Sequence, residues 1–167
     1  MPKKLSSFLK SLAGGFTEPV PDSAVPEPVA SEPADNERWG QILAGGNVPD
    51  ALKAAMDIDG ALGVALVDNN SGLALGMDGG GPDLDLEVAA AGNAEMVKSK
   101  MKAMSDLGLD DRIEDIVITL DTQVHLIRPI GHADGDGLFV YVALDRSASN
   151  LVIARRDLHT IEDVLLA

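Results

Sequence analysis

The sequence predicts an α+β domain in which a five-stranded antiparallel sheet carries helices on both faces. From about residue 48 to Ala167 the chain is continuously patterned, and the segments follow the order helix, two strands, helix, three strands, helix. Connections of hairpin length join the strands within each group, which makes neighbouring strands antiparallel. A single helical crossover joins the two groups, so one sheet with helices packed on its faces accounts for all of the segments.

The first helix and hairpin are indicated by proline, by apolar alternation and by turn residues. Pro49 opens a helix that runs to about Met56. Residues 61–67 alternate larger and smaller apolar side chains, as expected for a strand that is covered on both faces. The polar turn 68–72 and a returning strand over 73–77 complete the hairpin.

Three further strands and a final helix follow the crossover helix. The strands are expected over 114–120, 123–130 and 138–144, with a tight turn at Asp121-Thr122 and a Gly/Asp loop over 131–137. The last helix starts between Ser147 and Asn150. Its apolar residues recur at spacings of three and four, the period of a helix face: Leu151, Ala154, Leu158, Ile161 and Leu165.

The middle helix, which begins between Asp83 and Leu86 and ends at Gly108, is more apolar than one sheet face requires. Its apolar arc spans roughly 180°, whereas packing on a sheet needs somewhat more than about 100°. One stripe comprises Ala90, Ala94, Val97, Met101 and Met104, and a second flank comprises Leu86, Ala89, Met96, Ala103 and Leu107. The same helix of a second chain would cover the surplus flank, with Asn93 and Lys100 fixing its register. The alternative is that neighbouring elements of the same chain cover it.

Three segments precede the domain at 48–167. Residues 17–37 form an acidic, Pro-rich linker without Lys or Arg. Residues 38–47 are a short lead-in, in which Trp39, Ile42 and Leu43 fit a short packed helix. Residues 1–16 fit an amphipathic helix that docks on a membrane surface or a protein partner; a frayed tail or a helix folded back on the domain is the alternative. Its apolar face comprises Leu5, Phe8, Leu9, Leu12 and Phe16.

Composition and motifs exclude several classes of function. The net charge of −14 argues against nucleic acid as a partner. With no cysteine and no apolar run of about 18 residues, the sequence predicts a cytoplasmic protein, which residues 1–16 could attach to the membrane periphery. No phosphate-binding loop or paired metal-ligand spacing is present, so neither a cofactor nor a metal is expected. The three histidines are interpreted as structural or exposed: His125, His132 and His159.

Arginines near the last helix are the candidate partner-binding residues. Arg146, Arg155 and Arg156 leave a small basic area on an otherwise acidic chain, and such an area could meet an acidic partner.

Four stretches of the chain combine apolar patterning with characteristic turns. They are the run Gly60 to Asp68 with Ser71-Gly72, the helix opening Leu86-Glu87-Val88-Ala89-Ala90, the run Ile113 to Leu120 leading to His125-Leu126-Ile127-Arg128-Pro129, and Leu144-Asp145-Arg146 with Asn150-Leu151. Through these stretches the chain resembles, over about residues 48–160, bacterial members of the dynein light chain roadblock family. The resemblance rests on patterning and turns rather than on catalytic signatures.

The resemblance implies a profilin-like sheet and a homodimer formed through the middle helix and the third strand. It also implies a non-enzymatic module that regulates, or serves as a platform for, a small Ras-like GTPase. The alternative is a scaffold or adaptor that localises an assembly through its N-terminal helix, without linkage to a nucleotide. In this sequence the implied interface comprises Ala89, Asn93, Met96, Lys100, Ala103, Ile116 and Ile118.

Overall fold

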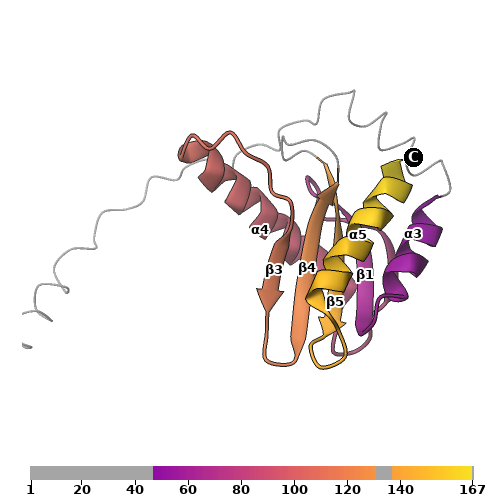
Figure 1. The fold of residues 1–167 in the computed structure, drawn as a ribbon. Helices are drawn as coiled ribbons and strands as arrows, with labels where there is room; N and C mark the ends of the chain where they lie inside the picture. Colours follow the sequence, from indigo (N-terminus) through magenta and orange to yellow (C-terminus); the bar gives the residue numbers. More distant parts are fainter. Residues whose placement is uncertain (1–46, 131–136, 167) are drawn as a thin grey trace, which may run out of the picture. The chain divides into compact units, whose positions relative to one another are not determined.

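The structure is a computed structural model that describes residues 47–130 and 137–166, which form a five-stranded antiparallel sheet with helices on both faces (Figure 1). The strand order is β2-β1-β5-β4-β3, and the class and element order agree with the sequence prediction. The predicted segments 1–16 and 17–37, the lead-in up to Gly46 and loop residues 131–136 lie outside the described residues. The elements are α3 (Asn47–Met56), β1 (Ala61–Asp68), β2 (Ala74–Gly79), α4 (Leu86–Asp106), β3 (Ile116–Thr119), β4 (Gln123–Ile130), β5 (Leu138–Asp145) and α5 (Leu151–Leu166).

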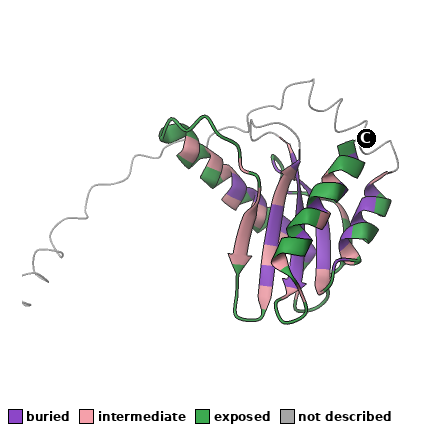
Figure 2. Cartoon of the chain, viewed as in Figure 1, coloured by how far each residue is buried: buried purple, intermediate pink, exposed green. Residues whose placement is uncertain are grey.

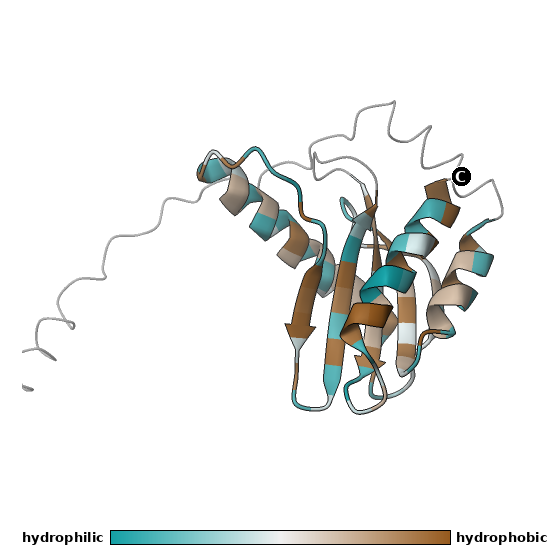
Figure 3. Cartoon of the chain, in the orientation of Figure 1, coloured by the Kyte–Doolittle hydropathy of each residue, from teal (hydrophilic) through white to brown (hydrophobic). Residues whose placement is uncertain are grey.

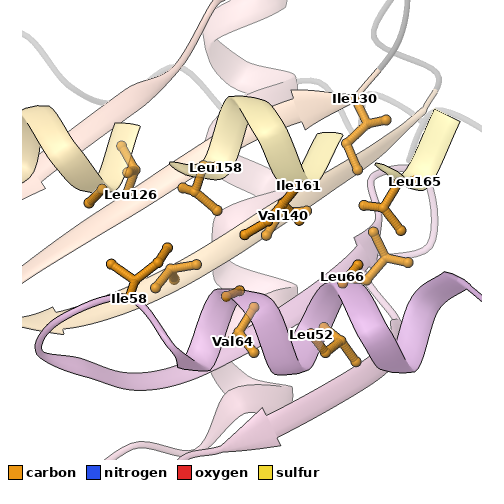
Figure 4. Close-up of a cluster of buried hydrophobic side chains, with 14 of the residues drawn as sticks. Leu52, Ile58, Val64, Leu66, Leu126, Ile130, Val140, Leu158, Ile161 and Leu165 are labelled. Carbon is orange, nitrogen blue, oxygen red and sulfur yellow. The ribbon is translucent and has the colours of Figure 1, made fainter. Parts of the chain in front are cut away.

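Two helices, α3 and α5, cover one face of the sheet. Figure 4 shows Leu52 of α3 and Leu158, Ile161 and Leu165 of α5 converging on side chains of the central strands. Apolar side chains recur along α5 at the predicted spacing and are buried there, which anchors the helix along its length. The strand side chains of this cluster are Val64, Leu66, Val124, Leu126, Ile130, Leu138, Val140, Val142 and Leu144.

A single helix, α4, covers the other face. Its buried side chains Ala90, Ala94 and Val97 fall on the first predicted stripe, and Leu86, which the sequence assigned to the second flank, is buried with them. They pack on buried side chains of the central strands that face α4: Ala65, Val67, Ile127, Phe139, Tyr141 and Ala143.

Polar side chains cap the starts of the two long helices, and a glycine follows the end of α4. Asp85 accepts hydrogen bonds from the amides of Glu87 and Val88 at 3.0 and 3.1 Å, so α4 begins at Leu86. Gly108, at φ 67°, adopts the left-handed conformation that ends a helix. Asn150 Oδ1 caps α5 in the same way as Asp85 caps α4.

The third strand is shorter than predicted, Ile116–Thr119 rather than 114–120. Ile116 pairs with Ile127, so Glu114 would lie opposite Pro129 if the strand continued. Proline has no amide hydrogen to donate to a neighbouring strand, and pairing stops before it.

The second strand is longer than predicted and reaches Gly79 rather than ending at 77. Asp78 and Gly79 pair with Val64 and Gly63 of β1. Backbone pairing does not require a side chain, and a Cβ on Gly79 would lie only 2.8 Å from the carbonyl oxygen of Leu62. Gly79 therefore allows a close approach of two strands.

Candidate interaction surfaces

The predicted dimer residues of the middle helix lie on one flank of α4. Ala89, Asn93 and Met96 are half-buried, whereas Lys100 and Ala103 are exposed. Ala89 and Met96 border the same apolar cluster as Ile116 and Ile118 of β3. The structure thus brings the helix residues and the strand residues of the predicted interface to the same face of the sheet, and the dimer contact itself stays a prediction.

The other flank of α4 contacts the β1–β2 turn. Lys98 Nζ donates to the carbonyl oxygen of Asn70 at 3.4 Å, and Gly72 lies against Ala91. Because this flank faces the β2 side of the sheet, the flank with Ala89 and Met96 faces the β3 side.

The strand β3 forms one edge of the sheet. It pairs with β4 on one side, and no described residue pairs with its outer edge. Ile116, Val117 and Ile118 are half-buried, and Figure 2 and Figure 3 show the strand as largely intermediate in burial and apolar in character. An apolar edge strand with free backbone groups is a template for pairing with another strand.

Charge is distributed unevenly along α4. Glu87 and Glu95 lie in the first half of the helix, whereas Lys98, Lys100 and Lys102 lie in the second half. Lys98 pairs with Glu95 at 2.6 Å and Lys102 with Asp106 at 2.8 Å. Lys100 forms no ion pair with a described residue, and it is the lysine that lies on the predicted interface flank.

A polar cluster adjoins this surface on β4 and β5. His125 lies opposite Ile118 in the register of β3 and β4, and its ring contacts the Tyr141 ring edge-on, with centroids 5.4 Å apart. Its Nε2 lies 2.9 Å from Gln123 Oε1, and its Nδ1 lies 3.3 Å from the Tyr141 hydroxyl. A neutral imidazole protonated on Nε2 satisfies both contacts, because it donates to the amide oxygen and accepts from the hydroxyl.

Burial keeps this cluster uncharged. Desolvation lowers the pKa of His125 below 6.5 and raises the pKa of Tyr141 to about 12. The interpretation of His125 as structural therefore agrees with its contacts.

Two of the three candidate arginines join separate elements. Arg155 Nε donates to Asp115 Oδ2 at 2.7 Å, which ties α5 to the residue before β3, and this hydrogen bond raises the pKa of Arg155. Arg146 donates to the carbonyl oxygen of Leu120 at 3.1 Å and so connects the loop after β5 to the β3–β4 turn. Both side chains thus have structural contacts besides any contact with a partner.

Arg156 differs from them because its carboxylate partner is its neighbour in sequence. Its side chain is 72% exposed, and it contacts Asp157 at 2.8 Å. An exposed pair of this kind contributes little to stability, so Arg156 can change partners at low cost.

A further polar cluster, between β4 and α5, was not predicted from the sequence. Arg128 Nε donates to Glu162 Oε2 at 2.7 Å, and its NH2 group lies 3.1 Å from His159 Nδ1. The Arg128 and Glu162 side chains are only 11% and 15% exposed, so the pair contributes to fixing α5 on the sheet. A charged residue within the apolar run of 123–130 is the signal that indicates such a partner.

This cluster borders a cavity of about 110 Å³ at the part of β4 that β3 does not cover. Val97 and Met101 of α4 line one side of it, and His159 and Glu162 of α5 line the other. Both acids and bases line the cavity, and Glu162 already neutralises Arg128, so the lining favours neither an anion nor a cation.

The described residues contain neither a metal-ligand cluster nor a helix that could span a membrane. Within 47–130 and 137–166, no three His, Cys, Asp or Glu side chains come together in a way that could hold a metal ion. None of the helices in these ranges combines the length and the apolar character needed to cross a membrane.

Comparison with solved structures identifies the fold. MglB from Myxococcus xanthus is 18% identical, with 78% of this chain and 88% of that chain covered and a TM-score of 0.59. A Roadblock/LC7 domain from Streptomyces avermitilis is 16% identical, covering 66% and 87% with a TM-score of 0.57. The gliding protein MglB from Thermus thermophilus is 16% identical, covering 72% and 86% with a TM-score of 0.61.

The chain therefore has the roadblock fold, as the resemblance implied. No protein-family model and no curated protein matches the sequence. The likeness consequently concerns the fold, and function is inferred from the surfaces described above.

The lowered pKa of His125 predicts a loss of stability on acidification. The unfolded chain binds a proton at His125 near pH 6.5, whereas the folded chain resists protonation. The stabilisation is therefore fully present above pH 6.5 and is lost as the pH falls from 6.5 to the folded-state pKa. We expect the free energy of unfolding of the wild type, from urea titrations at pH values on both sides of 6.5, to fall more than that of His125→Gln.

The glutamine variant keeps a polar side chain but does not titrate, and His159→Gln is the matched control on exposed α5. Equal pH slopes for wild type and His125→Gln would show that the desolvation argument is wrong.

Proposed function

We propose that this chain is a non-enzymatic homodimeric interaction module that binds or regulates a small Ras-like GTPase. The observation that carries the proposal is the surface shared by one flank of α4 and the outer edge of β3. Its apolar side chains Ala89, Met96, Ile116 and Ile118 are half-buried and border the core beneath α4. A surface of this kind is typical of a protein–protein contact.

A second copy of the chain fits this surface by its geometry. Two β3 edges pairing antiparallel would extend the sheet across both chains and satisfy the free backbone groups of Ile116 to Thr119. The α4 flank of each copy would then meet its counterpart around a two-fold axis, which makes the contact self-complementary. The roadblock resemblance implies the same two elements.

The charges on α4 favour an antiparallel contact between the two helices. In that orientation the half of one helix that carries Glu87 and Glu95 runs beside the half of the other helix that carries Lys98, Lys100 and Lys102. A parallel contact would bring like charges together.

The proposal that the partner is a GTPase rests on the roadblock resemblance. The contacts of the three candidate arginines indicate which of them is most free to bind such a partner. A dimer of this geometry presents the α4 pair on one face of the sheet and α3 with α5 of both copies on the other. Arg156 is the candidate contact on the second face, since it can change partners without breaking a contact between elements. Arg146 and Arg155 lie near it in sequence and remain candidates.

The alternative is a scaffold that localises an assembly through residues 1–16. It is favoured by the amphipathic pattern of this segment together with Lys3, Lys4 and Lys10, which would contact an anionic surface. It needs the dimer but no nucleotide-binding partner.

The dimer is tested by placing charge on the interface flank. In Met96→Glu/Ala103→Glu the two new carboxylates of each copy would enter an apolar contact in which only Lys100 lies near enough to pair with them, at a cost of several kcal/mol. We expect the wild type to sediment as a dimer at micromolar concentration and the variant to dissociate at least about a hundredfold more readily.

Ser99→Glu is the matched control, because Ser99 is an exposed α4 residue outside that flank. A wild type that sediments as a monomer, or a control that dissociates as readily as the double variant, is incompatible with this interface.

The GTPase partner is tested by titrating Ras-like GTPases of the native host, loaded with GTP or GDP, against the dimer. A regulator must bind the two forms with different affinity, because only differential affinity shifts a two-state switch. We expect such a difference for one GTPase, and Arg156→Glu to weaken its binding by about tenfold, or about 1.4 kcal/mol.

Lys102→Glu on α4 is the matched charge reversal on the opposite face of the sheet, and it tells which face makes the contact. If no GTPase binds a chain shown to be folded and dimeric, the GTPase proposal fails and the scaffold proposal takes its place.

The role of residues 1–16 is tested by sedimentation with vesicles that contain anionic lipid. Each lysine near the surface contributes only about 1 kcal/mol, so attachment depends on the apolar side chains and on two copies acting together. We expect the full chain to sediment with the vesicles and a chain lacking residues 1–16 to stay in solution. Equal recovery of both chains would leave a protein partner as the target of the segment.

A further inference from the structure

His125 lies on the α4 face of the sheet, at the end where β3 finishes. It stands opposite Ile118 of β3 and opposite Ala143 of β5 in the strand register. Both neighbours pack in the apolar cluster beneath α4, and residues directly opposite each other in a sheet share a face. The His125 side chain is half-buried, so part of it stays accessible to water in the single chain.

The first half of α4 lies at this same end of the sheet. A Cβ on Gly63 would come within 3.0 Å of the Leu86 side chain, and Gly63 pairs with Ala143 of β5. The second half of α4 lies at the opposite end, where Val97 lines the cavity beside Pro129. From there the chain leads to the start of β3 (Figure 1).

The proposed dimer would bring the second half of the other copy's α4 over His125. A two-fold axis between paired β3 edges places the start of one β3 beside the end of the other. Because the second half of α4 lies near the start of its own β3, it would lie near the end of β3 in the other copy, where His125 is. This half carries Lys98, Lys100 and Lys102, and its only carboxylate, Asp106, pairs with Lys102.

The groups that neighbour His125 on the sheet favour its neutral form. Its two hydrogen-bond partners, the Tyr141 hydroxyl and the Gln123 side chain, are uncharged. The carboxylate of Asp145, opposite Gln123, accepts hydrogen bonds from the amide and the hydroxyl of Ser147. The residues of β3 that face α4 are both isoleucines.

Helix α4 adds no negative charge on this side. Its flank toward β3 carries Lys100 as the one charged side chain, and Glu87 and Glu95 project at other angles of the helix. Desolvation already lowers the pKa of His125 in the single chain, and loss of the remaining water in the dimer would act in the same direction. The lysines of the other copy would add repulsion.

We propose that protonation of His125 weakens the homodimer and so makes its assembly depend on pH. A charged ring would be enclosed against the lysines of the other copy, and protonation on Nδ1 would remove the acceptor of the Tyr141 hydroxyl. Protons therefore bind more tightly to separate chains than to the dimer, and by linkage acid favours separation. This inference rests on the proposed dimer and assigns a control to the same surface, independently of the GTPase.

The experiment is sedimentation of the full-length chain over a series of concentrations, at pH values above and below 6.5. If the dimer disfavours the charged ring about tenfold in each copy, the dissociation constant rises by up to about a hundredfold over the full titration. We expect a rise of at least about tenfold for the wild type as the pH falls, and a nearly constant value for His125→Gln.

His159→Gln is the matched control, because His159 lies on α5, on the other face of the sheet, and this variant should keep the pH dependence of the wild type. Far-UV circular dichroism and the urea midpoint establish that each chain is folded at each pH.

A second measurement requires no variant. Linkage is reciprocal, so the pKa of His125, followed through its imidazole NMR signals, should fall as the chain concentration is raised from the monomeric into the dimeric range. The signals of His159 serve as the internal reference.

The outcomes separate this inference from the dimer itself. A chain that sediments as a monomer at the higher pH refutes the proposed dimer and this inference with it. A dimer whose dissociation constant is equal above and below 6.5 leaves the proposed dimer intact and overturns the role of His125. A His125→Gln dimer with the full pH dependence of the wild type also overturns it, since another group would then bind the proton.

Discussion

The burial of β5 on both faces is the constraint on which the rest of the structure depends. Every residue from Leu138 to Leu144 is buried, so this strand needs apolar cover above and below the sheet. Five strands spaced by about 4.8 Å span about 19 Å, whereas one helix is about 10–12 Å wide. Two helices therefore suffice for the face under α3 and α5, but α4 alone leaves the β3 side of the other face incompletely covered. The surface proposed for dimerisation is a consequence of this two-to-one helix count.

Patterning along the chain was enough to predict the class and the element order, since it records which faces of each element are apolar. The two-sided apolar character of 61–67 indicated a strand covered on both faces, and the surplus arc of the middle helix indicated the open flank. The order of the strands within the sheet could not be predicted in this way. Alternation along a strand indicates which face of the sheet a side chain lies on, but it does not indicate which strand lies beside it. The prediction that β3 starts at residue 114 was wrong for a related reason. Pro129 lies opposite that position on the neighbouring strand, and it has no amide hydrogen with which to continue the pairing.

The polar contacts were harder to predict, because their partners are distant in sequence. Arg128 and Glu162 meet only once α5 lies on the sheet, and Arg155 reaches Asp115 across 40 positions. The sequence does not distinguish Arg146, Arg155 and Arg156, but in the structure they differ in the contacts that each would lose on binding a partner. Reversing Arg155 would also break a contact that holds α5 near β3, so a loss of binding in that variant would not distinguish a partner contact from altered packing. Arg156, paired only with its neighbour, separates the two effects.

The proposed dimer defines an asymmetry between the faces of the sheet. A two-fold axis at the β3 edge would place both α4 helices on one face and both copies of Asn47 on the other. Asn47 is held there by its hydrogen bond to the carbonyl oxygen of Val164 in α5. Two weakly attracted N-terminal segments starting from the same side can engage one surface simultaneously, and the second contact then forms at a high effective concentration. An arrangement of this kind would leave the α4 face open to a soluble partner while the chain is held at a surface, so the GTPase and scaffold roles are compatible in one dimer.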